Sequence, residues 1–465
     1  MLLDISRYSW QSYKKELTAL IALALPMLLS QIAQVGAGFA DTVMAGRVSP
    51  ADLSAVGLGS SLLITVYITL MGVMTSLNPL IAQAYGKSQR SGNPNDNALI
   101  GELGRQGLWY GAVLGVVGML IIWACVAVFD SYGNLDARTL QTTKLYLWFG
   151  GFAMPAMMIH RALHAYASSL GKPKVIMIVS WLCLAVNVGL NWVFIYGKFG
   201  LPALGGAGCG VATALSFWIN ALVLGLYIAK DRYFGDYGLF TKVSLPDPKR
   251  LWELTKLGVP IGLSFFIEVS LFTCIIFLVA RLDGDTTTLI AAQQVVISLT
   301  SLIFMLPQSM GIASTVQVGA NLGKNNPHKA RYVSGVAISS GVAISLVTAG
   351  ILILFREQLG AIYTDDKAVI GVASGLLLFA AAFQLVDAVQ CIASYALRGY
   401  KLTKVPMLIH ALAFWGCGLV PGYVLAFYGG MGINGFWLAL VMSLAVAAVF
   451  LLWYLERHSK GLVRT

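Results

Sequence analysis

Residues 17–44 read LTALIALALPMLLSQIAQVGAGFADTVM, an apolar stretch whose only ionisable side chain is Asp41. At a rise of about 1.5 Å per residue, a helix of this length can cross the roughly 30 Å hydrocarbon core of a bilayer. Similar stretches recur along the chain, which is 58% hydrophobic and only 11% charged. A soluble protein carries about 25% charged residues. The sequence therefore predicts an all-α polytopic membrane protein.

Twelve transmembrane helices are expected. Their approximate bounds are 17–44, 54–84, 104–129, 143–169, 174–197, 207–230, 252–281, 288–317, 331–355, 370–397, 404–427 and 433–455. The first fifteen residues hold Asp4, Arg7, Lys14 and Lys15 without the apolar core and cleavage site of a secretory signal. The first apolar stretch is thus expected to be a retained span.

The basic residues indicate the topology. Most of the 31 Lys and Arg residues fall in the N-terminal segment, the even-numbered loops and the C-terminal segment. By the positive-inside rule both termini are cytoplasmic. The net charge of +11 therefore reports topology and contact with anionic lipid headgroups, and it does not predict a nucleic-acid partner.

The chain divides into two similar halves. The most charged connection, 231–250, separates residues 1–230 from 251–465, and we expect a six-helix bundle on each side of this cytoplasmic linker. The matching segments are ALP (24–26) with GVP (258–260), IAQAYGK (81–87) with VQVGANLGK (316–324), and AYASSLGKPKV (165–175) with SYALRGYKLTKV (394–405). Because six is even, a duplication relates the bundles by a pseudo-two-fold axis along the membrane normal, a known transporter plan.

Two prolines occupy equivalent places in the first span of each half. Pro26 and Pro260 each remove a backbone donor, so a kink is expected at both. The kink is either a static feature of packing or a hinge used in transport. In span three, Gly107, Gly111 and Gly115 form a stripe of small residues that predicts close packing within the bundle.

Three acids lie well inside apolar stretches: Asp41, Glu268 and Asp387. A carboxylate near the bilayer centre costs roughly 2.5–3.5 kcal/mol on insertion scales, which favours a functional role such as binding and releasing a cation. If Glu268 and Asp387 approach each other, they form an oxygen-rich site for Na⁺. If they stay apart in apolar surroundings, they can carry protons. The alternative for each acid is a hydrogen-bonded carboxyl that fixes helix packing.

Other candidate sites are weaker. His160 and His164 are one helical turn apart, but Arg161 between them favours a polar cluster at the membrane interface over a metal site. Asp366 precedes span ten, where a helix cap explains it from the residues alone. No GxxxxGK[ST] motif and no nucleophile or metal constellation occurs. We therefore expect neither an ATP motor, nor an enzyme, nor a cofactor, and no metal beyond Na⁺ at Glu268 and Asp387.

Several stretches together resemble the multidrug and toxic compound extrusion (MATE) family, in particular its NorM branch of Gram-negative bacteria. They are LALPMLLSQIAQVGAGFADTVMAG (23–46), LNPLIAQAYG (77–86), GVPIGLSFFIEVSLF (258–272) and FQLVDAVQCIASYALRGYKLTKVPM (383–407). The resemblance covers essentially the whole chain, including the span count and the duplication.

This resemblance implies two six-helix bundles facing a central cleft in the bacterial inner membrane, and Na⁺- or H⁺-driven antiport of cationic, often aromatic drugs. It assigns cation coupling to Glu268, Asp387 and Asp41. The residues that match drug-contacting positions in relatives are Asp41, Ser61, Phe272, Gln294, Phe304 and Asp366. Some relatives carry a tyrosine one turn before the span-ten acid, where this chain has Phe383, so one oxygen ligand for Na⁺ is missing.

The function expected is secondary active multidrug efflux in exchange for inward Na⁺ or H⁺. The nearest alternative is a flippase for lipid-linked oligosaccharide of the same superfamily, which predicts cationic rather than acidic residues in the cleft. An ion channel, which conducts without drug exchange, is a second alternative. The expected partners are small cationic or aromatic drugs and membrane lipids, with no nucleic acid and with the chain acting as a monomer.

Overall fold

The computed structural model describes residues 9–128, 136–282 and 285–464. Within these ranges the secondary structure is helical, without strands. Asp4 and Arg7 lie outside the described residues. Eleven helices in the described part are long and apolar enough to cross a membrane. The remaining predicted span, 143–169, corresponds to two shorter helices, α5 (Ala137–Gly151) and α6 (Ala153–Ser169), which are separated only by Phe152.

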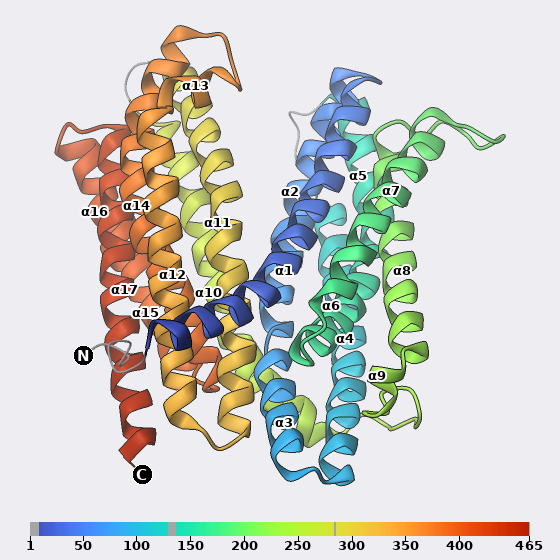
Figure 1. Cartoon of the computed structure of the whole chain (residues 1–465). Coiled ribbons are helices and arrows are strands. Elements are labelled where there is room, and N and C mark those ends of the chain that lie inside the picture. Colours follow the sequence, from blue (N-terminus) through green and yellow to red (C-terminus); the bar gives the residue numbers. More distant parts are fainter. Residues whose placement is uncertain (1–8, 129–135, 283–284, 465) are drawn as a thin grey trace. The chain divides into compact units, whose positions relative to one another are not determined.

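The chain forms two compact units. One comprises Leu25–Gly262, and the other comprises Met1–Ala24 together with Leu263–Thr465. The boundary expected from the sequence, the linker 231–250, does not coincide with these limits, because two long helices each contribute to both units. These are α1 (Trp10–Gly46) and α10 (Pro248–Val279) (Figure 1).

The prolines lie where the two helices change unit. Pro26 is inside α1, next to the limit at Ala24, and Pro260 is inside α10, within one turn of the limit at Gly262. Before the limit in α1, Leu20 and Ala24 pack in a core with residues of the C-terminal half. Before the limit in α10, Leu254 packs in the core of the unit Leu25–Gly262. Each proline therefore marks the exchange of its helix between units.

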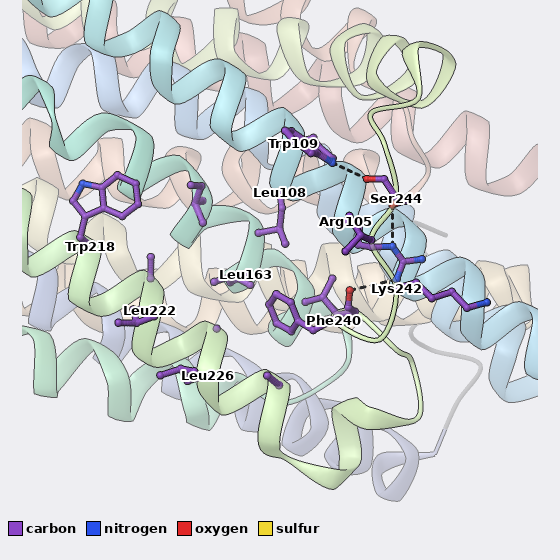
Figure 2. Close-up of a pocket in the computed structure, with 16 residues that line it drawn as sticks. Arg105, Leu108, Trp109, Leu163, Trp218, Leu222, Leu226, Phe240, Lys242 and Ser244 are labelled. Carbon is purple, nitrogen blue, oxygen red and sulfur yellow. Dashed lines mark hydrogen bonds between the residues drawn. The ribbon is translucent and has the colours of Figure 1, made fainter.

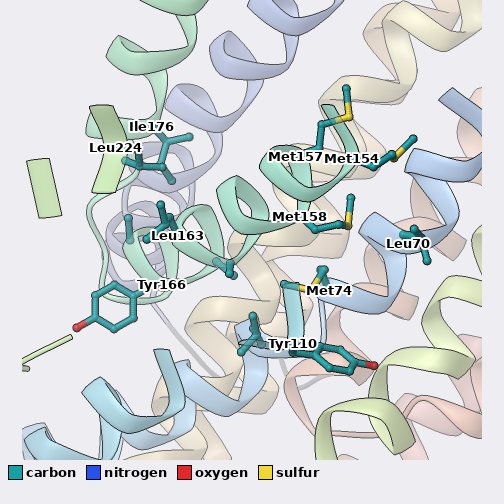
Figure 3. Close-up of a cluster of buried hydrophobic side chains, with 14 of the residues drawn as sticks. Leu70, Met74, Tyr110, Met154, Met157, Met158, Leu163, Tyr166, Ile176 and Leu224 are labelled. Carbon is teal, nitrogen blue, oxygen red and sulfur yellow. The ribbon is translucent and has the colours of Figure 1, made fainter. Parts of the chain in front are cut away.

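The unit Leu25–Gly262 contains the complete helices of the N-terminal half. They are α2 (Pro50–Met74), α3 (Leu77–Ser91), α4 (Pro94–Val128), α5, α6, α7 (Pro173–Tyr196), α8 (Ala207–Lys230) and the single turn α9 (Arg232–Gly235). Buried methionines and aliphatic residues of α2, α6, α7 and α8 fill its core (Figure 3). The predicted close packing of the span-three glycines is confirmed, since a Cβ at Gly111 would lie 2.8 Å from the Met158 carbonyl oxygen of α6.

The other unit is built mainly from the C-terminal half. Its helices are α11 (Thr286–Gly323), α12 (Pro327–Leu354), α13 (Arg356–Ala361), α14 (Lys367–Gly399), α15 (Lys404–Ala411), α16 (Val420–Tyr423) and α17 (Ile433–Arg464). Two stretches of π-helix, Leu412–Leu419 and Val424–Tyr428, join α15 and α16 into one span. Such widened turns are uncommon and often lie near functional sites.

Candidate functional site

Asp387 lies in the middle of α14 and is only 2% exposed. Its Oδ1 accepts a hydrogen bond of 2.9 Å from the side-chain amide of Gln390, one turn further along the same helix. The Gln390 carbonyl oxygen lies 3.0 Å from Nε2 of His410 on α15. Because that oxygen can only accept, His410 Nε2 carries a proton and donates it. Asp387 is therefore held by a relay of three buried side chains.

The last member of this relay is fixed by packing. The His410 imidazole stacks on Phe414 with ring centroids 5.2 Å apart and planes 13° apart. Its Nδ1 is buried and has no hydrogen-bond partner among the described residues. Sequence reasoning did not identify Gln390 or His410, because neither is charged and only the packing of α15 against α14 brings them to the acid.

Glu268, on α10, is half-buried and lies within electrostatic range of both Asp387 and Arg398. No hydrogen bond or ion pair of Glu268 is found in the described part of the chain. The structure thus brings together the two acids that the sequence singled out. Neither acid has a cation bound to it among the described side chains.

Arg398 is the basic residue closest in role to a counter-ion, but it is used differently. Its guanidinium carbon lies 3.9 Å from the ring centroid of Tyr395 and 5.1 Å from that of Phe265. One terminal nitrogen, Nη1, is buried without a hydrogen-bond partner in the described residues. Stacking on two rings stabilises the cation where it is, so Arg398 attenuates the negative charge of the pair without neutralising it.

Asp41 forms a second polar cluster in the unit Leu25–Gly262. Its Oδ1 accepts from Asn191 Nδ2 at 2.5 Å, and its Oδ2 accepts from Thr213 Oγ1 at 3.2 Å. Asn191 also donates to Asn187 Oδ1 at 3.2 Å, while its own Oδ1 is buried without a partner in the described chain. Helices α1, α7 and α8 thus place four oxygen-bearing side chains together.

This second cluster can hold a small cation or a proton. The sequence predicted Asp41 and missed Asn187, Asn191 and Thr213. A usable signal was present, because Asn187 and Asn191 lie four residues apart and so share one face of an otherwise apolar helix. No group of three or more His, Cys, Asp or Glu that could hold a metal occurs among the described residues. A cation here would therefore rely on amide and hydroxyl oxygens.

The residues assigned to drug contact are spread over both units. Ser61 is exposed on α2, whereas Phe272, Gln294, Phe304 and Asp366 belong to the other unit. Phe272 meets Phe383 edge-on at 6.3 Å, and Phe383 meets Trp437 at 6.1 Å. The tyrosine position of some relatives is thus occupied here by the centre of an aromatic row.

Asp366 behaves as the residues alone suggested. It is exposed and caps α14, where its Oδ1 accepts from the backbone N–H of Ala368 at 2.8 Å. The expectation for the histidine pair is wrong about its location. His160 and His164 are buried, at 1% and 5% exposure, and do not lie in an interfacial cluster. The reason is that α6 packs on all sides within its unit, a feature that hydropathy does not reveal.

Comparisons with known proteins agree with this architecture. The MatE family model matches twice, over residues 26–193 and 260–424, which confirms the predicted duplication. The probable multidrug resistance protein NorM of Neisseria meningitidis serogroup A is 52% identical over 465 residues, covering 100% of this chain and 99% of that protein. The probable NorM of Chromobacterium violaceum is 46% identical, with 99% and 98% covered.

Solved structures show the same fold. The MATE transporter NorM-NG, solved in complex with a drug and a monobody, is 49% identical with a TM-score of 0.81, covering 95% of this chain and 94% of that one. The eukaryotic MATE transporter AtDTX14 has a TM-score of 0.84 at 19% identity, with 97% and 99% covered, and supports the fold alone. The prediction of an all-α fold of this family is confirmed.

Proposed function

Because this chain belongs to the MATE family, we propose that it is a secondary active transporter that exports cationic and aromatic drugs in exchange for inward Na⁺ or H⁺. Its relatives are named multidrug resistance proteins, and the related NorM-NG was solved in complex with a drug. The chain is accordingly a transporter of small molecules, and drug export is the activity to test.

The observation that carries the proposal is the pair Glu268 and Asp387 in one unit, without a bound counter-ion among the described side chains. Two adjacent carboxylates inside a membrane protein repel each other and are poorly solvated, so they require a cation or a proton. Gln390 occupies one oxygen of Asp387 and leaves Oδ2 for that ion. Occupation and release of this site by Na⁺ or H⁺ is the proposed coupling step.

Drug and ion exert opposite effects on the conformational equilibrium. A ligand shifts an equilibrium only through its different affinities for the two states. We assign ion binding to Glu268 and Asp387, with a second ion or drug contact at Asp41. Ser61, Phe272, Gln294, Phe304 and Asp366 remain the proposed drug contacts.

Energetics favour an exchange that moves net charge. One charge crossing 100 mV yields about 2.3 kcal/mol, whereas a tenfold concentration gradient yields about 1.4 kcal/mol. Exchange of one monovalent drug cation for one ion cancels the electrical contribution. Two acids in one cluster can carry a second charge, so electrogenic exchange is proposed.

We propose Pro26 and Pro260 as the hinges of the conformational change. Each interrupts the hydrogen-bond ladder of its helix close to the point where that helix passes from one compact unit to the other. A bend at these points changes the orientation of a unit without disturbing its core.

The chain is proposed to reside in the bacterial inner membrane with both termini cytoplasmic, as the distribution of Lys and Arg suggests. A monomer suffices for coupling, because the partners of Asp387 lie in one unit and those of Asp41 in the other, all within this chain. Cysteine labelling from either side of sealed vesicles tests the orientation, and light scattering of the purified protein tests the monomer.

Ethidium export from proteoliposomes, with Na⁺ and pH gradients imposed separately, tests the function. Glu268→Gln and Asp387→Asn are expected to abolish ion-driven export while the protein still folds. Asp285→Asn serves as the matched control, because Asp285 is an exposed helix cap and asparagine caps equally well. Unchanged ion-driven export in both site variants would refute the coupling role.

The same experiment separates the alternatives. Which gradient drives export identifies the ion, and dependence on an imposed membrane potential tests electrogenic exchange. Conductance without any drug present would indicate a channel instead. Transport of a lipid-linked pyrophosphate compound without drug export would favour the flippase.

A further inference from the structure

A groove of about 710 Å³ lies on the side of the unit Leu25–Gly262 and has no role in the proposed transport cycle. It runs between α4, α6 and α8 and is closed on one side by residues 239–244 of the linker (Figure 2). All of its lining residues belong to one unit. Apolar side chains dominate the lining, so the groove suits an apolar ligand.

The groove is chemically different at its two ends. One wall is the face of α8 that carries Trp218, Leu222 and Leu226, spaced four residues apart. The cationic residues Arg105 and Lys242 lie at the other end, beside the linker (Figure 2). A ligand that fits this arrangement has a long apolar part and a polar head at one end.

The length of the apolar part matches one leaflet of a bilayer. From Trp218 to Ala229, both of which line the groove, α8 rises about 16 Å at 1.5 Å per residue. Half of the hydrocarbon core of a bilayer is about 15 Å thick. One acyl chain of a phospholipid therefore spans the groove with its head at the linker.

The wall made by the linker is held firmly on α4. Arg105 donates from Nε to Ser244 Oγ at 2.9 Å and from Nη1 to the Gly238 carbonyl at 2.7 Å. Trp109 Nε1 donates to the Ser244 carbonyl at 2.9 Å. These bonds fix the linker before any ligand arrives, so the groove is preformed.

The same linker exposes apolar side chains. Val243 is 97% exposed and Leu245 is 82% exposed, and Phe240 nearby is half-exposed. A cluster of this kind at a polar surface marks contact with a membrane or a partner. Lys242 stands among these residues and is exposed, as expected for an amphipathic side chain at a lipid interface.

The charges at the head end favour an anion. The guanidinium of Arg105 is balanced by Glu102, with Nη2 and Oε2 2.8 Å apart. No ion pair of Lys242 is found within the residues that the structure describes. Lys242 thus supplies an uncompensated positive charge, which attracts a phosphate and repels the cationic compounds proposed as cargo.

We propose that this groove binds an anionic phospholipid, with one acyl chain along α8 and the phosphate beside Lys242. The proposal is independent of the transport function. The lipid would secure the linker 231–250, which connects the two halves of the chain, to the membrane surface.

Native mass spectrometry of the purified full chain tests this proposal. After incubation with equal amounts of phosphatidylglycerol and phosphatidylcholine of the same acyl chains, the wild-type protein is expected to retain the anionic lipid about fivefold better. Lys242→Gln is expected to bring this ratio close to one. Lys249→Gln, which changes an exposed lysine on the same linker outside the groove, is expected to leave it unchanged.

A second variant tests the groove itself. A Cβ at Gly225 meets only ordinary contacts, 3.6 Å from Leu163 and 4.0 Å from Phe240, so Gly225→Leu fills the groove without disturbing the backbone. This variant is expected to retain less of both lipids. Equal retention of the two lipids by the wild type, or equal effects of the two lysine variants, would overturn the proposal. Displacement of the lipid by ethidium would also overturn it, because the groove would then be a drug site.

Discussion

Asp387 and Gln390 lie one turn apart on α14, and the Gln390 amide donates a 2.9 Å hydrogen bond to Oδ1 of the acid. This bond distinguishes the two oxygens of a carboxylate that would otherwise be equivalent. Oδ1 is occupied, whereas no partner of Oδ2 is found among the described residues. An incoming cation or proton is therefore directed to Oδ2.

Gln390→Leu removes this donor at nearly constant volume. The ion-free carboxylate loses a hydrogen bond worth about 1.5–3 kcal/mol, so that state becomes less stable relative to the ion-bound state. We expect the half-saturating ion concentration for export to fall by about tenfold or more, and the maximal rate to fall because ion release slows. Initial rates of ethidium export at varied Na⁺ and varied pH measure both quantities.

The control for this variant is Gln358→Leu, at an exposed glutamine of α13 in the same unit. It is expected to leave the ion dependence unchanged. A Gln390→Leu protein with wild-type half-saturation for both ions would show that the bond to Asp387 only supports packing.

His410 is expected to act through the orientation of Gln390. His410→Gln keeps a donor for the Gln390 carbonyl, whereas His410→Phe keeps the stacking on Phe414 but removes the donor. Without the donor, the Gln390 amide can turn over and present its oxygen to Asp387. We expect His410→Phe to reproduce the changed ion dependence of Gln390→Leu and His410→Gln to remain close to wild type.

The same transport measurements, together with thermal unfolding, decide this point. If both His410 variants lose export in proportion to their loss of stability, the imidazole has only a structural role. A changed ion dependence in His410→Phe at unchanged thermal stability supports positioning.

The sequence identified the acids but not their partners, for a physical reason. A charge inside an apolar span is expensive, so Asp41, Glu268 and Asp387 stand out in any hydropathy profile. Gln390 and His410 are polar but neutral, and such residues also occur in spans as packing groups. Their role depends on which helix lies beside α14, which residue spacing within one helix does not reveal.

The helix bounds show a similar limit. Hydropathy marks the part of a helix that contacts lipid, whereas capping decides where the helix begins. The third span was expected from residue 104, but α4 begins at Pro94, where proline is well suited to the first turn of a helix. The fourth span was expected as one helix and is divided at Phe152.

Asp52 shows that burial alone does not make a coupling acid. It is 3% exposed, yet it accepts from Gly206 N–H at 2.8 Å and pairs with Arg138 at 3.0 Å. We expect Asp52→Asn to lower the stability by about 1 kcal/mol, since the Arg138 side chain is largely exposed, and to leave the ion dependence of export unchanged. Thermal unfolding and export assays check the two parts. A shifted ion dependence would make Asp52 a further coupling residue.

The close approach of α10 to α2 depends on small residues. A Cβ at Gly262 would lie 2.8 Å from the Thr69 carbonyl oxygen, whereas a Cβ at Gly189 on α7 meets nothing within 4 Å. We expect Gly262→Ala to destabilise the protein by about 1–3 kcal/mol through overpacking. Gly189→Ala should be neutral or stabilise by up to about 1 kcal/mol. Thermal unfolding in detergent compares them, and an equally stable pair would contradict the helix contact.

Pro260 and Pro307 allow a matched test of the hinge. Both are prolines inside long helices, but Pro260 lies where α10 changes unit, while Pro307 lies within α11 in a single unit. Replacing a helix proline by alanine relieves a penalty of about 3 kcal/mol and stiffens the helix. We expect Pro260→Ala to slow export at least about tenfold, since a straight helix is then favoured over a bent one by more than 1.4 kcal/mol, and Pro307→Ala to have little effect on the rate. Because both variants should be at least as stable as the wild type, a loss of export cannot be attributed to unfolding. Equal rates for the two variants would mean that the bend at Pro260 is static.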